Sequence, residues 1–143
     1  MDFKTRDVIN VLETNIDDCT GETLGYVMDR LFKAGARDVF YTPIYMKKNR
    51  PAYKLTVLCT DDMTEEAENI IFSETTSIGL RKRKEERVCL KREIKEIETK
   101  YGKLKVKSVL SPIGEKIYPE FESAKELAEK NHTALNEIYK EIK

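Results

Sequence analysis

The segment between residues 8 and 83 alternates strand-like and helix-like hydrophobic patterns. Strand patterns cover about 8–16, 38–46, 52–60 and 80–83, and helix patterns cover about 21–34 and 62–74. This β-α-β-β-α-β order is typical of a ferredoxin-like domain. With right-handed crossovers, both helices cover one face of a four-stranded antiparallel sheet. The first and third strands are then expected in the centre of the sheet, and the second and fourth at its edges.

The rest of the chain extends this arrangement. Strand patterns cover about 87–94, 97–100 and 104–110, residues 111–119 are interpreted as a loop, and helices are expected at 122–129 and after Thr133. We therefore predict an α+β fold, with a ferredoxin-like βαββαβ core, an added β-hairpin and C-terminal helices. Because no repeat or low-complexity linker is present, residues 1–143 are predicted to form a single domain.

Composition argues against several classes of protein. Lys+Arg and Asp+Glu both number 26, so the net charge is zero and favours neither nucleic acid nor a membrane surface as a partner. No apolar run is long enough to span a bilayer, and we expect a cytoplasmic protein. Cys19, Cys59 and Cys89 are widely spaced, which indicates reduced thiols. His132 is the single histidine, which argues against a histidine-based metal site within the chain.

An acidic segment, residues 12–22, joins the first strand to the first helix. Strand alternation places Glu13, Asn15 and Asp17 on one face and Asp18 on the other. Asp and Asn are poor strand formers, so their presence here needs a reason. One interpretation is that Asp17, Asp18 or Thr20 caps the helix. The other is a hard-cation site, because Mg²⁺ or Mn²⁺ is held by a few carboxylates together with substrate phosphates.

Two polar segments complement this acidic one. Lys47, Lys48, Asn49 and Arg50 form a basic hairpin turn, in which Arg50 is suited to bidentate phosphate contact. The alternative is a solvated turn. Residues 74–81 place Glu74, Thr75, Thr76, Ser77, Gly79 and Arg81 at a helix-to-strand junction. The alternative there is a polar helix end whose hydroxyls bond to backbone carbonyls. Carboxylates for a cation and basic groups for phosphates together suggest a metal–nucleotide site.

Several long motifs resemble one known family. Residues 12–22, 24–28, 38–44, 46–51, 55–59, 74–81 and 118–122 are similar, in this order, to the C-terminal half of the LarC family. The resemblance covers nearly the whole chain. It implies a role in inserting nickel into pyridinium-3,5-bisthiocarboxylic acid mononucleotide, which completes the nickel-pincer nucleotide cofactor of lactate racemase. The family is a CTP-dependent cyclometallase that needs Mn²⁺ or Mg²⁺ and splits CTP into CMP and pyrophosphate.

The resemblance also implies partners and site residues. The C-terminal half is the part linked to CTP, so we expect CTP, the pincer precursor, the N-terminal half of the enzyme and further copies of the chain as partners. Glu13, Asp17 and Asp18 are the metal candidates, Lys47, Lys48, Asn49, Arg50 and Arg81 the triphosphate candidates, and Thr75 and Thr76 the hydroxyl donors. We assign no catalytic residue.

Two departures from the family pattern qualify the expected role. Position 19 is Cys where the family motif usually has Met, and His132 is the single histidine, whereas the N-terminal half of full-length members carries a His-rich segment. The expected enzyme, a lyase-class nickel chelatase, is therefore the full-length protein and not this chain alone. The alternatives are a regulatory nucleotide-sensing module and an oligomerisation domain.

Overall fold

A computed structural model describes residues 2–142, which divide into two compact units. The inner unit is Asp7–Arg87, and the flanking unit comprises the described residues on either side of it. The sequence predicted one domain and did not anticipate this division. The reason is that β1 (Lys4–Ile16) and β4 (Arg81–Leu90) are continuous strands that each contribute residues to both units, with no linker composition between them.

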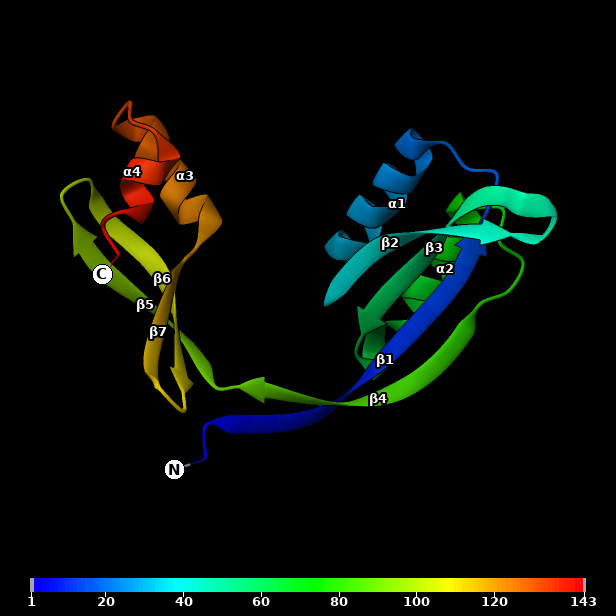
Figure 1. The fold of residues 1–143 in the computed structure, drawn as a ribbon, viewed down its shortest axis with the longest axis horizontal. Helices are drawn as coiled ribbons and strands as arrows, with labels where there is room; N and C mark the ends of the chain where they lie inside the picture. The colour runs from blue at the N-terminus through cyan, green and yellow to red at the C-terminus, as the bar shows by residue number, and fades with distance from the viewer. Residues whose placement is uncertain (1, 143) are drawn as a thin grey trace. The chain divides into compact units, whose positions relative to one another are not determined.

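The inner unit is built on a four-stranded sheet with the strand order β2-β3-β1-β4 (Figure 1). Its further elements are α1 (Gly21–Ala34), β2 (Asp38–Met46), β3 (Arg50–Cys59) and α2 (Thr64–Glu74). Short 3-10 turns cover Lys47–Asn49 and Asp61–Met63. The antiparallel pairing sets Leu12 opposite Val57 across β1 and β3. The predicted α+β class is confirmed, as are the predicted central and edge strands.

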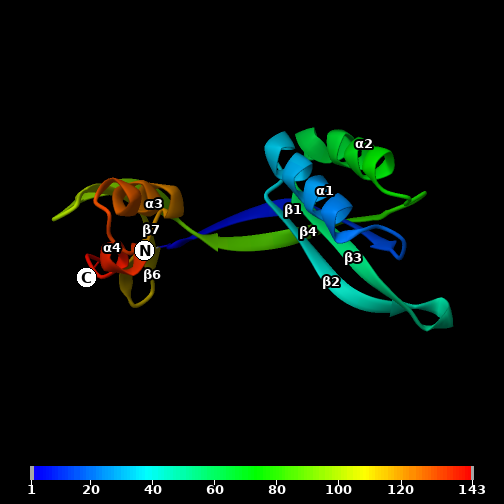
Figure 2. The ribbon, with the colours of Figure 1, turned by 90° about the horizontal axis from the view of Figure 1, so that it is seen from above.

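Both helices of the inner unit lie on the same side of its sheet (Figure 2). Their buried side chains, at helical spacing, pack on every second residue of the central strands. The core consists of Leu12, Leu24, Val27, Leu31, Leu55, Val57, Ala67, Ile70 and Ile71, with neighbours around them. Alternation sends Glu13 of β1 and Thr56 of β3, which are register partners, to the sheet face opposite the helices.

Helix α1 begins and ends where the sequence predicts. The Thr20 hydroxyl accepts a hydrogen bond from the Thr23 backbone N–H at 3.2 Å, which makes Thr20 the N-cap. Gly35 ends the helix in the left-handed region, with φ 110°, where its N–H bonds to carbonyls of the last turn. Of the three residues considered as caps, Thr20 serves, so Asp17 and Asp18 need another explanation.

The flanking unit pairs a second antiparallel sheet with two helices. Its elements are β5 (Arg92–Thr99), β6 (Gly102–Ser111), β7 (Gly114–Pro119), α3 (Phe121–Lys130) and α4 (Leu135–Tyr139), and the strand order is β5-β6-β7. Its core contains Leu104 and Val106 of β6 and Ala124, Ala128 and Ile138 of the helices.

The predicted loop at 111–119 is wrong, because it contains the edge strand β7. Ser111 donates a side-chain hydrogen bond to the Gly114 carbonyl at 2.7 Å, and Gly114 has φ 117°, so the chain reverses in a tight turn. Pro119 closes the strand at an outer edge, where the missing N–H costs no ladder bond. Within residues 2–142, no helix combines the length and the apolar character needed to cross a bilayer.

Candidate functional site

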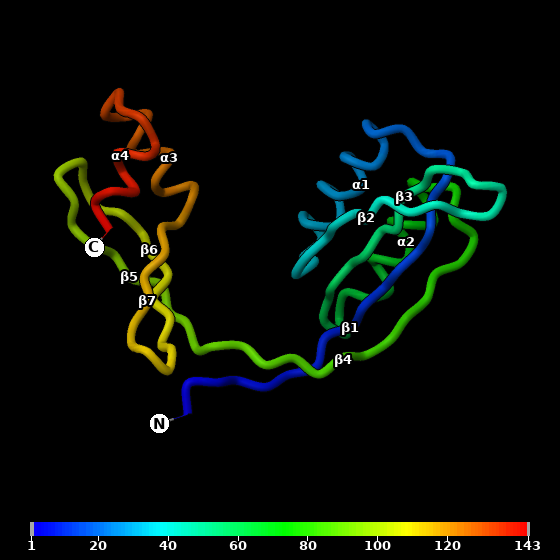
Figure 3. Tube along the Cα trace, in the orientation of Figure 1, coloured from blue at the N-terminus to red at the C-terminus, as the bar shows by residue number. Residues whose placement is uncertain are grey.

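Three segments that are distant in sequence meet at one end of the inner-unit sheet. Figure 3 traces the end of β1, the tip of the β2–β3 hairpin and the α2–β4 connection at this end. A hollow of about 380 Å³ lies there. Its lining includes Asn15, Asp17, Asp18, Thr76, Ser77 and Arg81. The structure therefore brings two of the predicted metal candidates together with two of the predicted phosphate-binding residues.

The 75–79 loop, which connects α2 to β4, is fastened to β1 by hydroxyl groups. Thr14 Oγ1 lies 2.5 Å from Ser77 Oγ and donates to the Gly79 carbonyl at 3.0 Å. Thr76 Oγ1 donates to Asp18 Oδ1. Thr75 Oγ1 instead donates to the Ile71 carbonyl of α2 at 2.7 Å, as expected of a polar helix end. Of the two predicted hydroxyl donors, only Thr76 is among the residues that line the hollow.

The basic groups reach the acidic segment from two directions. Arg81 Nη2 donates to Asn15 Oδ1 at 3.0 Å, and Arg50 Nη1 lies 3.6 Å from Asp17 Oδ2. Lys48 and Asn49 adopt left-handed conformations, with φ 62° and 57°. None of the four residues of the basic turn is among the described residues that line the hollow, and Arg50 is the one whose charge lies within ion-pair distance of an acidic residue.

Glu13 is held by arginines of β4. Arg83 Nη2 lies 2.8 Å from Glu13 Oε1, and Arg81 Nη2 lies 3.6 Å from Glu13 Oε2. The hydrogen bond from Arg83, followed by the charges of Arg83, Lys54 and Arg81, lowers the pKa of Glu13 below its ordinary value, although burial opposes this shift. The carboxyl is therefore a stable anion that already has two cationic partners.

Of the three predicted metal candidates, Asp17 and Asp18 line the hollow and Glu13 does not. The described part of the chain contains no group of three or more His, Cys, Asp or Glu side chains able to hold a metal ion. A cation in the hollow therefore has Asp17 and Asp18 as protein carboxylates. Such a pair fits Mg²⁺ or Mn²⁺, since Mg²⁺ commonly binds one or two carboxylates, with water and substrate phosphates completing its shell.

The sequence did not indicate the supporting role of Thr14, Asn15 and Ser77. Thr14 is 3% exposed and lies among apolar residues on the helix-covered face of the sheet. A buried hydroxyl normally has a hydrogen-bond partner, so a Thr at a core-facing strand position was the available signal. Its partner was not predictable from local pattern, because Ser77 is 63 positions away.

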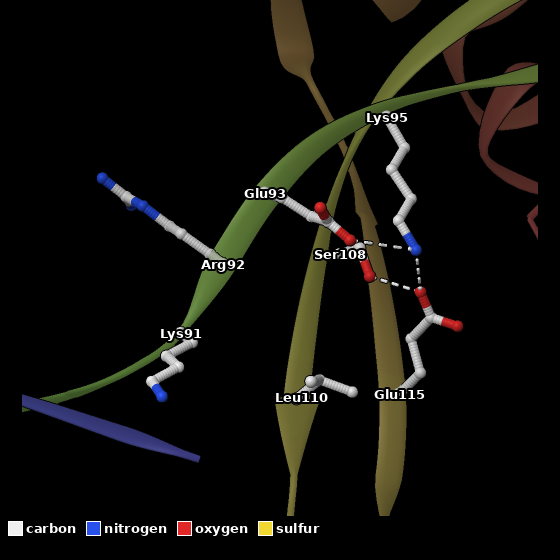
Figure 4. Close-up of a pocket in the computed structure, with 7 residues that line it drawn as sticks. All are labelled: Lys91, Arg92, Glu93, Lys95, Ser108, Leu110 and Glu115. Atoms are coloured by element: carbon white, nitrogen blue, oxygen red, sulfur yellow. Dashed lines mark hydrogen bonds and ion pairs between the residues drawn. The ribbon is translucent and has the colours of Figure 1, made fainter. Parts of the chain in front are cut away.

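A second hollow, of about 340 Å³, lies in the flanking unit (Figure 4). There Lys95 Nζ lies 2.9 Å from Glu115 Oε1 and 3.2 Å from Glu93 Oε1, and Ser108 donates to Glu115. The hydrogen bonds that Lys95 donates to Glu115 and then Glu93 raise the pKa of Lys95. Both carboxylates of this hollow pair with the same lysine, whereas Asp17 and Asp18 share no cationic partner among the described residues, so the inner-unit hollow is the stronger candidate for a cation and its anionic ligand.

A family model and two curated relatives that match this chain all concern nickel insertion proteins. The family model described as "Nickel insertion protein" matches residues 2–139. The chain is 51% identical over 132 residues to the pyridinium-3,5-bisthiocarboxylic acid mononucleotide nickel insertion protein of Alkaliphilus metalliredigens, covering 92% of this chain and 31% of that protein. It is 49% identical over 136 residues to the protein of the same name from Acetivibrio thermocellus, covering 95% and 33%. The chain thus spans about a third of these relatives.

A solved structure extends the similarity to three dimensions. It is described as LarC2, the C-terminal domain of a cyclometallase involved in the synthesis of the NPN cofactor of lactate racemase, in its apo form. The TM-score is 0.88 at 42% identity, and the alignment covers 96% of this chain and 95% of that domain. The alignment therefore includes residues of both the inner and the flanking unit.

Proposed function

This chain belongs to the nickel insertion protein family, and from this membership we propose that it is the metal–CTP-binding part of a longer nickel insertion enzyme. The complete enzyme is proposed to insert nickel into pyridinium-3,5-bisthiocarboxylic acid mononucleotide, with CTP split into CMP and pyrophosphate. That activity, a lyase-class nickel chelatase, belongs to the longer protein, because this chain spans about a third of the relatives that carry the name. Nickel is a substrate of this reaction.

One observation carries the proposal for this chain. Asp17 and Asp18 line the same hollow as Thr76 and Arg81, and Arg50 approaches Asp17 from the hairpin tip. Carboxylates and guanidinium groups so close together suit a ligand that brings both negative charge and a divalent cation. A nucleoside triphosphate with Mn²⁺ or Mg²⁺ has this composition.

The chain's own residues have separate parts in the proposed reaction. Asp17 and Asp18 hold the cation, while Arg81 and Arg50 orient the phosphate chain and Thr76 donates a hydroxyl hydrogen bond. A bound Mn²⁺ or Mg²⁺ would neutralise negative charge on the phosphate oxygens. Fixed positive groups of this kind favour departure of pyrophosphate when the α-phosphorus is attacked. Attack by water gives CMP and pyrophosphate directly, whereas attack by a thiocarboxylate oxygen of the pincer precursor gives pyrophosphate and a precursor–CMP adduct, from which CMP must then leave.

The proposed partners are CTP, the pincer precursor, the N-terminal part of the same enzyme and further copies of this chain, in the cytoplasm. One exposed side chain at the site is available for contact with a macromolecular partner. Ile78, a large apolar side chain on the rim of the hollow, is fully exposed. We therefore retain, as a second candidate, a role in nucleotide sensing or oligomerisation without turnover.

The test is CTP turnover by the longer protein with single substitutions in this chain. Asp17→Asn and Arg81→Ala are each expected to lower the rate of pyrophosphate release at least tenfold. Glu115→Gln, which changes the hollow of the flanking unit, is the matched control and is expected to be neutral. Unchanged turnover in both site variants would exclude the proposed site. CTP binding without any turnover, in the presence of precursor and nickel, would favour the sensing role.

A further inference from the structure

Two residues of β1 hold one guanidinium of β4. Glu13 and Asn15 lie on the same face of β1, and Arg81 begins β4, the neighbouring strand. Arg81 Nη2 donates to Asn15 Oδ1 at 3.0 Å and lies 3.6 Å from Glu13 Oε2. Arg81 lines the hollow, whereas Glu13 is not among the residues that line it. Glu13 therefore contacts the hollow through Arg81.

The exposures of the two side chains show why this contact matters. The Glu13 side chain is 11% exposed and the Arg81 side chain is 56% exposed. A half-exposed arginine samples many rotamers, and ordering it on a ligand costs conformational entropy. An anchored carboxylate beside it reduces that cost, because the guanidinium is already oriented when the ligand arrives.

The second arginine on Glu13 has another carboxylate partner. Arg83 Nε lies 2.6 Å from Glu85 Oε1, in addition to its contact with Glu13. In the described part of the chain, the other contact of Arg81 is with the neutral amide of Asn15. Removal of the Glu13 carboxylate therefore leaves Arg83 with the carboxylate of Glu85, and leaves Arg81 without a carboxylate partner among the described residues.

We propose that Glu13 is a positioning residue that, with Asn15, holds Arg81 at the hollow for the phosphates of the ligand, while Asp17 and Asp18 take the cation. This inference rests on the proposed function and assigns Glu13 a part other than that of a metal ligand. It separates two properties, since removal of Glu13 weakens phosphate binding and leaves cation binding intact.

The test measures the two properties separately on the 143-residue chain. Binding of Mn²⁺ alone is followed by the electron paramagnetic resonance signal of free Mn²⁺, and binding of inorganic triphosphate in the presence of Mn²⁺ by calorimetry. Glu13→Ala is expected to leave the Mn²⁺ affinity within about twofold and to weaken triphosphate binding about tenfold. Glu85→Ala is the matched control, because Glu85 contacts Arg83 only, and no change is expected.

A double-mutant cycle tests whether Glu13 acts through Arg81. Arg81→Ala and the combined Glu13→Ala/Arg81→Ala variant are expected to bind triphosphate equally weakly, because the second change removes a support for a group that is already absent. Should Glu13→Ala prevent folding, Asn15→Ala replaces it, with the same expected loss of triphosphate affinity and unchanged Mn²⁺ binding.

Four results would overturn the inference. Weaker binding of Mn²⁺ alone by Glu13→Ala would identify Glu13 as a ligand, and an equal further loss in the Arg81→Ala background would show independent action. Normal triphosphate binding by Glu13→Ala would contradict the inference while the proposed function stands. Absence of triphosphate binding by the unmodified chain with Mn²⁺ would instead overturn the proposed function together with the inference.

Discussion

Thr14 Oγ1 and Ser77 Oγ lie 2.5 Å apart, although 63 positions separate the two residues. Thr14 also donates to the Gly79 carbonyl, so a hydroxyl on the helix-covered face of the sheet fixes the loop that lines the candidate site. Burying a hydroxyl among apolar residues is unfavourable unless it is hydrogen-bonded. The position of the 75–79 loop is thus tied to the core of the inner unit.

Replacing Thr14 with valine tests this tie. Thr14→Val keeps the shape of the side chain but removes its hydrogen bonds to Ser77 and Gly79. We expect a loss of about 1–3 kcal/mol in the free energy of unfolding, measured by chemical denaturation.

The matched control is Thr56→Val on the adjacent strand. Thr56 is 4% exposed, and its Oγ1 is buried without a hydrogen-bond partner among the described residues. Valine there removes an unpaired polar atom, so the free energy of unfolding is expected to stay equal or to rise. Equal destabilisation by both substitutions would show that the Thr14 bonds contribute nothing beyond shape.

Arg50 is expected to matter more than its neighbours in the basic turn. It lies 3.6 Å from Asp17, whereas Lys47 forms no ion pair with an acidic residue in the part of the chain that the structure describes. Arg50→Ala is predicted to weaken Mn²⁺-dependent CTP binding about tenfold, since it removes a charged hydrogen-bond donor. Lys47→Ala removes the same charge and is predicted to change the dissociation constant less than about twofold. Calorimetry that finds equal effects would mean that the whole turn contacts the ligand.

Because each unit has its own hydrophobic core, a substitution in one core is expected to destabilise mainly the unit that contains it. Leu12 of the inner unit and Leu104 of the flanking unit are both fully buried, in different hydrophobic clusters. Substitution of either by alanine is expected to cost about 2–5 kcal/mol. Hydrogen exchange should then show lost amide protection mainly in the unit that carries the substitution. Equal loss in both units for both variants would indicate one cooperative fold, as the sequence had predicted.

The hydrogen bond between Arg83 and Glu13 predicts that the free energy of unfolding depends on pH in the acidic range. Its folded-state pKa lies below the ordinary value of 4.5, chiefly because of the hydrogen bond from Arg83. The resulting stabilisation is present above pH 4.5 and is lost as the pH falls through the lower, folded-state pKa. In denaturation at a series of pH values, the unmodified chain should lose more stability over this range than Glu13→Gln. Parallel curves for the two proteins would contradict the assignment.

Local patterns were sufficient for much of the fold. The spacing of apolar residues with Thr20 and Gly35 at the ends set the bounds of α1, because a cap and a left-handed glycine act within one turn. The strand β7 was missed, because it is a short edge strand in which Gly114 and Pro119 read as loop residues. The boundary between the two compact units leaves no signal in the composition, because it falls within continuous strands.

The sequence indicated which kinds of side chain form the candidate site, but not which of these residues lie next to one another. Alternation along β1 correctly placed Glu13 and Asn15 on one face, yet only the pairing of β4 with β1 brings Arg83 onto Glu13. The turn at Lys48 and Asn49 likewise decides which basic residue reaches the acids. These outcomes depend on contacts between distant segments and therefore require the three-dimensional structure.

The most direct test of the proposed function is calorimetric titration of CTP, ATP and GTP into this chain, with and without Mn²⁺. The account predicts Mn²⁺-dependent binding that is selective for CTP and is lost in Asp17→Asn. Failure to bind any nucleotide, or CTP binding that is indifferent both to Mn²⁺ and to Asp17→Asn, would contradict it.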